Sequence, residues 1–455
     1  MNPLNLTAAL SALTMALTGC ATAGRQAAAI TPQPAANVAR VEHVARSPIP
    51  EEQAIGPASL SDLQSLVAYG LANSSRLAAA EADWMAATEH SAGVGRLPDP
   101  RFSYSESVEE VQTRTGPQER RFGITQAFPK RGELDAKERI ADHEATAFWH
   151  MMQSEHFKVV EEIELAYHDY AFLASQLRVT GKLVNLLRNL EPVVQARVRA
   201  GGGQEDLLRL QIEIGRLEDD LASLERRQPA LSAELARTLT WHADAASLPL
   251  PAEIVPQTHV QTRGELLEMA LADNPALHVL EARARARQAG EDLAGVAARP
   301  SFGARIDYIQ TGEALNPSVS GSGDDPLMVG ISMSLPVWRS RYAAGEREAR
   351  QRTRALRERI DTAQLKLVSL VEEQAYRVED AARRITLVRE SLIPRANEAM
   401  TLTLISYRTG KSSVLDLIDS ERALLEFELS YWRATRAYLQ GESRLRALTG
   451  QGAKR

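Results

Sequence analysis

Three histidines are the residues whose type and spacing most directly suggest chemistry. His143, His150 and His156 stand seven and six residues apart on one predicted helix, so they share roughly one face of it. Zinc-binding histidines on a helix are spaced four apart, and this wider spacing favours surface histidines. The chain contains no HExxH, CxxC, P-loop or nucleophile-elbow motif. We therefore expect no enzyme, no cofactor and no resident metal.

The single cysteine, Cys20, has a different significance. It ends a short apolar run, Leu4 to Leu17, through Thr18-Gly19, which is the pattern of a secretion signal. The run is too short to span a bilayer. Its end resembles the lipobox of bacterial lipoproteins, and this resemblance implies acylation of Cys20 and, with Ala21 next, sorting to the outer membrane. The alternative is a signal peptide with an incidental cysteine.

The composition of the chain favours long helices. Of 455 residues, 25% are charged and only 5% are aromatic, and Ala, Leu, Arg and Glu dominate, as in coiled coils. The formal net charge of −6 gives no nucleic-acid footprint. Leucines and tyrosines at spacings of three, four and seven after residues 203 and 412 predict coiled-coil seams.

Three motifs recur in the same order about two hundred residues apart, which indicates a two-fold internal repeat. The pairs are Leu71–Leu77 with Leu271–Leu277, Phe122–Pro129 with Val329–Pro336, and Arg199-Ala-Gly201 with Arg408-Thr-Gly410. Each repeat is predicted to contain a helix, two strands, a very long helix, a reversal at glycine and a returning helix.

These patterns divide the chain into six parts. We predict a lipoprotein signal peptide at 1–19, a lipidated tether at 20–58, repeat 1 at 59–241, a connector at 242–263 that does not pack deeply, repeat 2 at 264–450 and a tail at 451–455. In repeat 1, a helix from about 60 to 95 precedes strands at about 101–108 and 121–128 and a long helix at about 130–199. In repeat 2 the strands are at about 301–309 and 327–337, and the long helix is at about 339–408. Pro192 and Pro394 are expected to kink these helices rather than end them.

The strands have one apolar face and one small or polar face, as Phe102 and Tyr104 against Ser103 and Ser105 illustrate. A sheet in lipid can leave no edge unpaired, and four strands cannot close a barrel. Two chains would give eight strands, whereas three would give twelve and a lumen. We therefore predict a membrane-spanning trimer. The alternative is a pair of soluble edge hairpins.

The order of elements resembles the TolC family of outer-membrane efflux ducts. Its motifs here are Gln126-Ala-Phe-Pro129, Leu335-Pro336, Tyr407-Arg-Thr-Gly410 and Val414–Asp419. The resemblance implies a mainly α homotrimer, with a 12-strand outer-membrane β-barrel continuous with a periplasmic α-helical coiled-coil barrel. It also implies a periplasmic adaptor protein and an inner-membrane RND-type pump as partners, with outer-membrane lipid around the barrel.

The same resemblance assigns roles to the two helix reversals. It implies that the turns at Gly201, Gly202 and Gly203 and at Gly410 are the periplasmic tips where adaptors dock. It implies that Asp416 and Asp419 ring the aperture and that Tyr407 helps to hold it closed, although Ser412 replaces an arginine of the best-known members. Three inward carboxylates would attract cations and repel one another. The alternative for the aspartates is a solvated helix face.

The cargo is the least determined property. Leu97–Pro100, Phe128–Gly132 and Leu335–Arg339 resemble segments of the heavy-metal branch, the CusC-like and CzcC-like members. That resemblance implies metal-ion efflux, and the alternatives are efflux of drugs or organic compounds and type I protein export. Proteins of another class, a non-conducting periplasmic adaptor or a structural coiled coil, would lack lipid-facing strands.

Overall fold

The computed structural model describes residues 62–451 except 242–247, 260 and 317. Cys20, the predicted signal and tether, and residues 452–455 lie outside the described residues. The described residues belong to one compact unit, Gly56–Arg455. In chain order the elements are α2 (Leu63–Asn73), α3 (Ser75–Val94), β1 (Arg101–Thr113), β2 (Gly116–Phe128), α4 (Glu133–Arg199), α5 (Gln204–Thr238), α6 (Arg263–Asp273), α7 (Pro275–Val296), β3 (Phe302–Thr311), β4 (Leu327–Met333), α8 (Arg339–Leu387), the π-helical turn η3 (Val388–Leu392), α9 (Ile393–Arg408) and α10 (Val414–Thr449).

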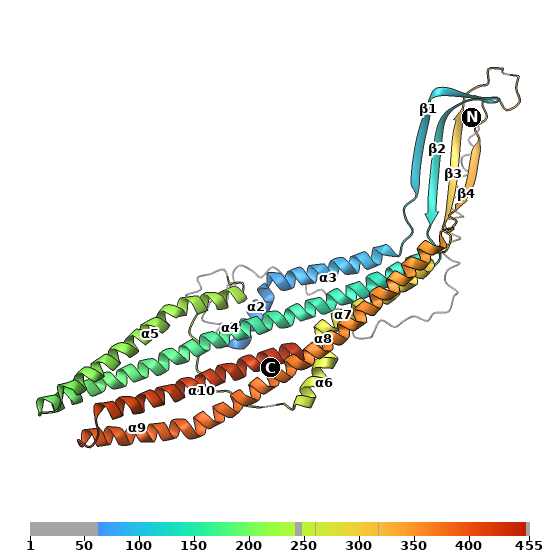
Figure 1. Ribbon diagram of the computed structural model, residues 1–455. Coiled ribbons are helices and arrows are strands. Elements are labelled where there is room, and N and C mark those ends of the chain that lie inside the picture. The colour runs from blue at the N-terminus through green and yellow to red at the C-terminus, as the bar shows by residue number, and fades with distance from the viewer. Residues whose placement is uncertain (1–61, 242–247, 260, 317, 452–455) are drawn as a thin grey trace. The chain divides into compact units, whose positions relative to one another are not determined.

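Both halves of the chain contain the same series of elements: two short helices, two strands, a long helical stretch and a returning helix (Figure 1). The two short helices replace the single helix predicted from about 60 to 95. They separate at Ser74 and Asn274, whose side chains accept hydrogen bonds from the backbone N–H of Leu77 at 3.2 Å and of Leu277 at 3.1 Å. The first repeated sequence motif is therefore a helix break with a new N-cap.

The four strands form one antiparallel sheet in the order β1-β2-β3-β4, so the β2–β3 ladder joins the two halves (Figure 1). The first two strands are longer than predicted, because residues 109–120 continue both strands to a turn at Arg114 and Thr115. β4 ends at Met333 instead of about 337. Pro336 has no N–H to donate and pushes its neighbour away from regular pairing.

The two long helices differ in continuity. α4 runs for 67 residues with Pro192 inside it. The helix predicted at 339–408 is instead α8, η3 and α9, with Pro394 near the start of α9. The N–H of Ile393 bonds to the carbonyl of Val388, the wider spacing of a π-turn. This turn absorbs the disturbance that proline introduces into a helix.

Helix α4 packs against α3, α5, α7 and α10, and α10 packs against α4, α8 and α9. One apolar core lies between the ends of both hairpins and includes Leu187, Val194, Leu210 and Leu417, all at most 3% exposed. Because residues of α4, α5, α9 and α10 all enter this core, the two hairpins support each other near their turns.

The connector between the halves packs more deeply than predicted. Leu248 is 3% exposed and belongs to the core of the first half. The Tyr170 hydroxyl donates to the carbonyl of Leu248 at 3.1 Å, and the Tyr438 hydroxyl accepts from the N–H of His259 at 3.0 Å. The prediction was wrong here because an irregular backbone can be buried when side chains supply its hydrogen-bond partners.

Candidate functional site

One face of the sheet is apolar in every strand. The ladder aligns Phe102, Ile124, Ile306 and Val329 in one row, and Tyr104, Phe122, Tyr308 and Leu327 in the next. The large apolar side chains exposed on this face are Phe102, Tyr104, Ile124, Phe128, Phe302, Tyr308, Leu327, Val329, Ile331 and Met333. Val329 and Ile331 are 73% and 84% exposed, which shows that nothing in the described chain covers the face.

The opposite face carries small and polar residues. Ser103, Gly123 and Asp307 lie in one row across it. A Cβ atom on Gly123 would lie 2.6 Å from the Ser103 hydroxyl and 2.8 Å from an Asp307 carboxylate oxygen, so the glycine leaves room for these polar groups. The outer edges of β1 and β4 have no partner strand among the described residues. A sheet with one exposed apolar face and two unpaired edge strands requires further partners, either lipid or other copies of the chain.

The two helix reversals have the same geometry. Gly201 and Gly410 adopt positive φ values of 99° and 79°. In the first turn the N–H of Gly202 bonds to the carbonyl of Arg197, and in the second that of Lys411 bonds to the carbonyl of Ser406. Each is a Schellman-type ending, which explains why a glycine stands at each position. Gly202 and Gly203 do not share the positive φ.

Arg197 links the two turns, and sequence reasoning missed it. Its guanidinium donates to the backbone carbonyl of Tyr407 at 3.1 Å and lies over the Tyr407 ring, 4.8 Å from the centroid. Tyr407 is only 1% exposed, and among the described residues its hydroxyl has no hydrogen-bond partner. Tyr407 therefore contacts the other hairpin through its ring and backbone. No signal in the sequence pairs residues 210 positions apart.

Asp416 and Asp419 lie near the start of α10 and differ in their surroundings. The backbone N–H and the hydroxyl of Ser413 both donate to the Asp416 carboxylate at 2.8 Å, and the N–H of Asp416 donates back to Ser413. This capping box lowers the pKa of Asp416, chiefly through the backbone bond. The Asp419 side chain is 62% exposed, with an Arg422 nitrogen 4.0 Å away. Asp416 thus has a local structural role, while Asp419 extends into solvent.

Two buried carboxylates, one from each hairpin, lie near this end of the helices. Glu213 of α5 and Glu421 of α10 are 3% and 1% exposed. Arg422 and Arg216 both bind Glu213, at 2.5 and 2.9 Å, and hydrogen bonding from Arg422 first of all lowers the pKa of Glu213. Neither oxygen of Glu421 has a partner among the described residues. Burial, and then the charge on Glu213, raises the pKa of Glu421 to about 8, so this carboxyl is protonated at neutral pH.

The histidines do not form a metal site in the part of the chain that the structure describes, where no cluster of three or more ligating side chains is found. The His150 ring instead lies against His278 of α7, with centroids 5.0 Å apart. Burial lowers the pKa of His143, His150 and His156.

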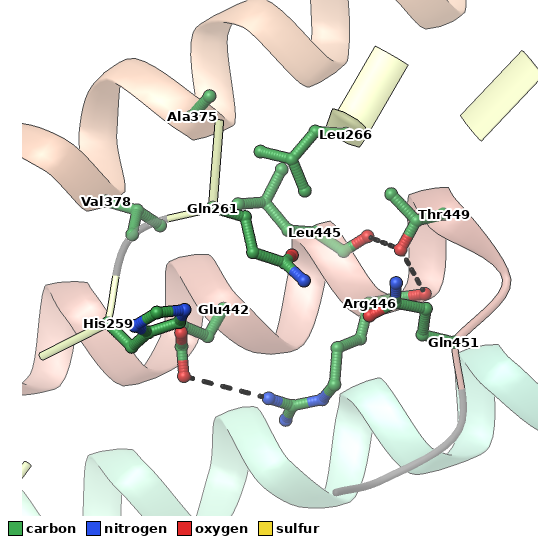
Figure 2. Close-up of a pocket in the computed structure, with 10 residues that line it drawn as sticks. All are labelled: His259, Gln261, Leu266, Ala375, Val378, Glu442, Leu445, Arg446, Thr449 and Gln451. Carbon is green, nitrogen blue, oxygen red and sulfur yellow. Dashed lines mark hydrogen bonds and ion pairs between the residues drawn. The ribbon is translucent and has the colours of Figure 1, made fainter. Parts of the chain in front are cut away.

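A small cavity lies where the connector, α6, α8 and α10 meet (Figure 2). Its volume is about 20 Å³, room for one water. Figure 2 shows Glu442 and Arg446 joined beside it, at 4.0 Å, and Arg446 also binds the buried Glu164 of α4 at 2.5 Å. These contacts make the cavity part of the joint between the halves rather than a ligand site.

Comparison with solved structures identifies the fold as that of outer-membrane channels. The outer-membrane channel OprN matches with 18% identity and a TM-score of 0.71, over 86% of this chain and 90% of that one. The outer membrane protein VceC from Vibrio cholerae matches with 17% identity and a TM-score of 0.71, over 86% and 96%. CusC matches with 14% identity and a TM-score of 0.70, over 86% and 92%. No curated protein sequence matches the chain.

Residues 266–451 match the family model described as outer membrane efflux protein. This segment of the chain therefore contains the outer-membrane efflux domain that the motifs predicted, and the whole described chain has the fold of the solved TolC-type channels. Its relatives are channels, which belong to a transport class rather than an enzyme class. Among the described residues, no helix combines the length and the apolar character needed to cross a bilayer.

Proposed function

We propose that this protein is the exit duct of a tripartite efflux system. Three copies close a 12-strand barrel in the outer membrane, and their helices form a periplasmic tunnel. An inner-membrane pump of the RND type delivers cargo through a periplasmic adaptor, and the duct conducts it passively to the exterior. The protein supplies a path through the envelope and no chemistry.

The uncovered apolar face of the sheet supports this proposal most strongly. Ten large apolar side chains are exposed on one face of the only sheet in the described chain, and both edge strands lack a partner there. Lipid would cover the apolar face, and strands of neighbouring copies would pair with the two edges. The row formed by Tyr104, Phe122 and Tyr308, with ring centroids 5.3 and 6.3 Å apart, fits an aromatic girdle at a bilayer surface.

We assign the aperture to the hairpin turns. Asp419 is the better candidate for an anionic ring, because most of its side chain is in solvent and Asp416 is engaged in capping. Arg197 and Tyr407 hold the two turns of one protomer together. The exposed turns at Gly201–Gly203 and Gly410 are the proposed docking points for the adaptor.

Single-channel recording in a planar bilayer tests this function. The purified full chain should insert as a trimer and conduct ions, with a preference for cations. Asp419→Asn should lower the cation preference several-fold, since three charges leave one constriction, while Asp220→Asn on α5 serves as a matched control. A chain that stays monomeric and fails to conduct would exclude a duct and favour an adaptor or a structural coiled coil.

The cargo and the anchor are separate proposals. The segments that resemble the heavy-metal branch support metal ions, and efflux of drugs or organic compounds is the alternative. The structural matches have nearly equal TM-scores and do not favour either cargo. Transport assays with the partner pump decide this question, because selectivity belongs to the pump.

We also propose that Cys20 is acylated and anchors the chain at the periplasmic side. Mass spectrometry of the mature N-terminus, compared with Cys20→Ala, tests the anchor.

A further inference from the structure

The two ends of the apolar sheet face carry opposite charge. At the helix end, the links between strands and helices and the first turns of α4 and α8 contain six cations against the carboxylates Asp99, Glu133 and Asp135. The cations, here called the basic collar, are Arg96, Lys130, Arg131, Arg299, Arg339 and Arg341. At the far end, the β1–β2 turn region (109–120) and the β3–β4 loop (312–326) contain six carboxylates and two arginines.

The collar cations are mostly exposed, and no carboxylate of the described chain lies within ion-pair distance of them. All except the half-buried Lys130 are exposed, and none of the six forms an ion pair within the described residues. Glu133 is already bound by Lys137 at 2.8 Å. The Arg299 guanidinium donates to the backbone carbonyl of Arg131 at 2.8 Å, which joins two of the links that carry the collar. Cations gathered at one end of the sheet without ion-pair partners in the described chain favour an anion from outside the chain.

Apolar side chains lie next to the collar. Leu335, Val337 and Trp338 are 67%, 66% and 71% exposed, and Arg339 and Arg341 follow them directly. An exposed tryptophan followed by arginines is the chemistry of a membrane interface, where the ring lies at headgroup depth and the cations reach phosphate. Guanidinium groups bind phosphate oxygens in pairs, which gives them an advantage over simple charge attraction.

We infer that the basic collar binds the phosphate headgroups of anionic glycerophospholipids in the leaflet on the helix side of the sheet. This inference rests on the proposed function, because the apolar face must first lie in a bilayer. The collar then selects the lipids around the end of the barrel that lies next to the helices. The acidic far end of the sheet disfavours the reversed orientation in the membrane, in which it would lie at the anionic leaflet.

Trp338 reports directly on the neighbouring lipid. The full chain is reconstituted in phosphatidylcholine bilayers that contain a minor fraction of either brominated phosphatidylglycerol or brominated phosphatidylcholine. At low salt the anionic quencher should quench Trp338 fluorescence at least about twofold more strongly, and high salt should reduce this ratio. The chain has five tryptophans, and Trp338→Phe separates the signal of Trp338 from that of the other four.

Matched variants assign the effect to the collar. Lys130→Gln, Arg131→Gln, Arg339→Gln and Arg341→Gln together should bring the quenching ratio to about one. Arg354→Gln with Arg357→Gln, farther along α8, should leave it unchanged. Equal quenching by both lipids in the unaltered chain would overturn the lipid preference while leaving bilayer insertion intact. No quenching by either lipid would instead overturn the insertion itself. Loss of the preference with inorganic phosphate, but not with sodium chloride at the same ionic strength, would show a general anion site rather than a lipid site.

Discussion

The two helical hairpins share one plan and differ in how firmly each is built. The first has an uninterrupted α4 and a buried Glu213 bound by two arginines. The second has the π-turn η3 and a buried Glu421 with no partner among the described residues. Both reverse at a glycine of positive φ. The comparison indicates that the first hairpin is the more rigid of the two. The second contains the weaker interactions, so a change of conformation requires less energy there.

The buried carboxylates give the largest expected difference between the hairpins. Because the pKa of Glu421 is raised in the folded state, its protonated form favours folding. That contribution is complete below the ordinary pKa of 4.5 and is lost as the pH rises to about 8. Glu421→Gln, which carries no charge at any pH, should leave stability nearly unchanged at pH 4.5 and increase it by roughly 2–4 kcal/mol at pH 9. Unfolding in detergent at both pH values measures this.

The corresponding change in the first hairpin should have the opposite sign. Glu213→Gln removes the carboxylate that Arg422 and Arg216 bind, and it should lower stability at neutral pH by roughly 1–2 kcal/mol, because both arginines keep access to water. A gain from Glu421→Gln of equal size at both pH values would contradict the assignment of a protonated Glu421.

Replacing the glycine at either helix reversal by alanine should change the stability by a similar amount. This comparison tests whether the two hairpins differ at their turns. Nothing lies within 4 Å of a Cβ atom built on Gly201 or Gly410, so alanine meets only backbone strain, about 1–2 kcal/mol in a left-handed conformation. Gly201→Ala and Gly410→Ala should each lower the thermal midpoint in detergent. Gly215→Ala, inside α5 and also without near neighbours, should raise it. A difference in sign between the two turns would disprove their equivalence.

The prolines give the smallest expected effect. Residue 192 cannot donate to the carbonyl of Arg188 within α4, and Pro192→Ala should restore this bond and stabilise the chain by up to about 1 kcal/mol. Pro394→Ala should change stability less, because the π-turn already bonds Ile393 to Val388. Hydrogen exchange of the flanking amides compares the two variants. Stronger protection after Pro394→Ala than after Pro192→Ala would mean that the proline alone maintains η3.

The sequence predicted the channel fold, the order of the elements and the two glycine turns, because these depend on local patterns. It missed features that depend on distant partners. Glu213 and Arg422 are 209 positions apart, and a glutamate on an amphipathic helix normally indicates a solvated face. The unpartnered Glu421 was missed for the same reason.

Local exceptions also escaped the patterns. The predicted first strand ends at about 108, because the segment from Glu109 to Arg120 is charged and contains Gly116-Pro117. β1 nevertheless extends to Thr113, since a strand exposed beyond the apolar rows does not need the alternation. The helix breaks at Ser74 and Asn274 could have been found, since both are strong N-cap residues inside a repeated motif.

The open edges of the sheet have a consequence for biogenesis. β1 carries Glu106, Glu109 and Glu110, whereas β4, Leu327–Met333, carries no charge. Two β1 edges from different copies repel one another, but two β4 edges do not. In the proposed assembly, a single copy is therefore at risk mainly through β4, and the expected dead-end species is a pair of chains joined wrongly along that strand.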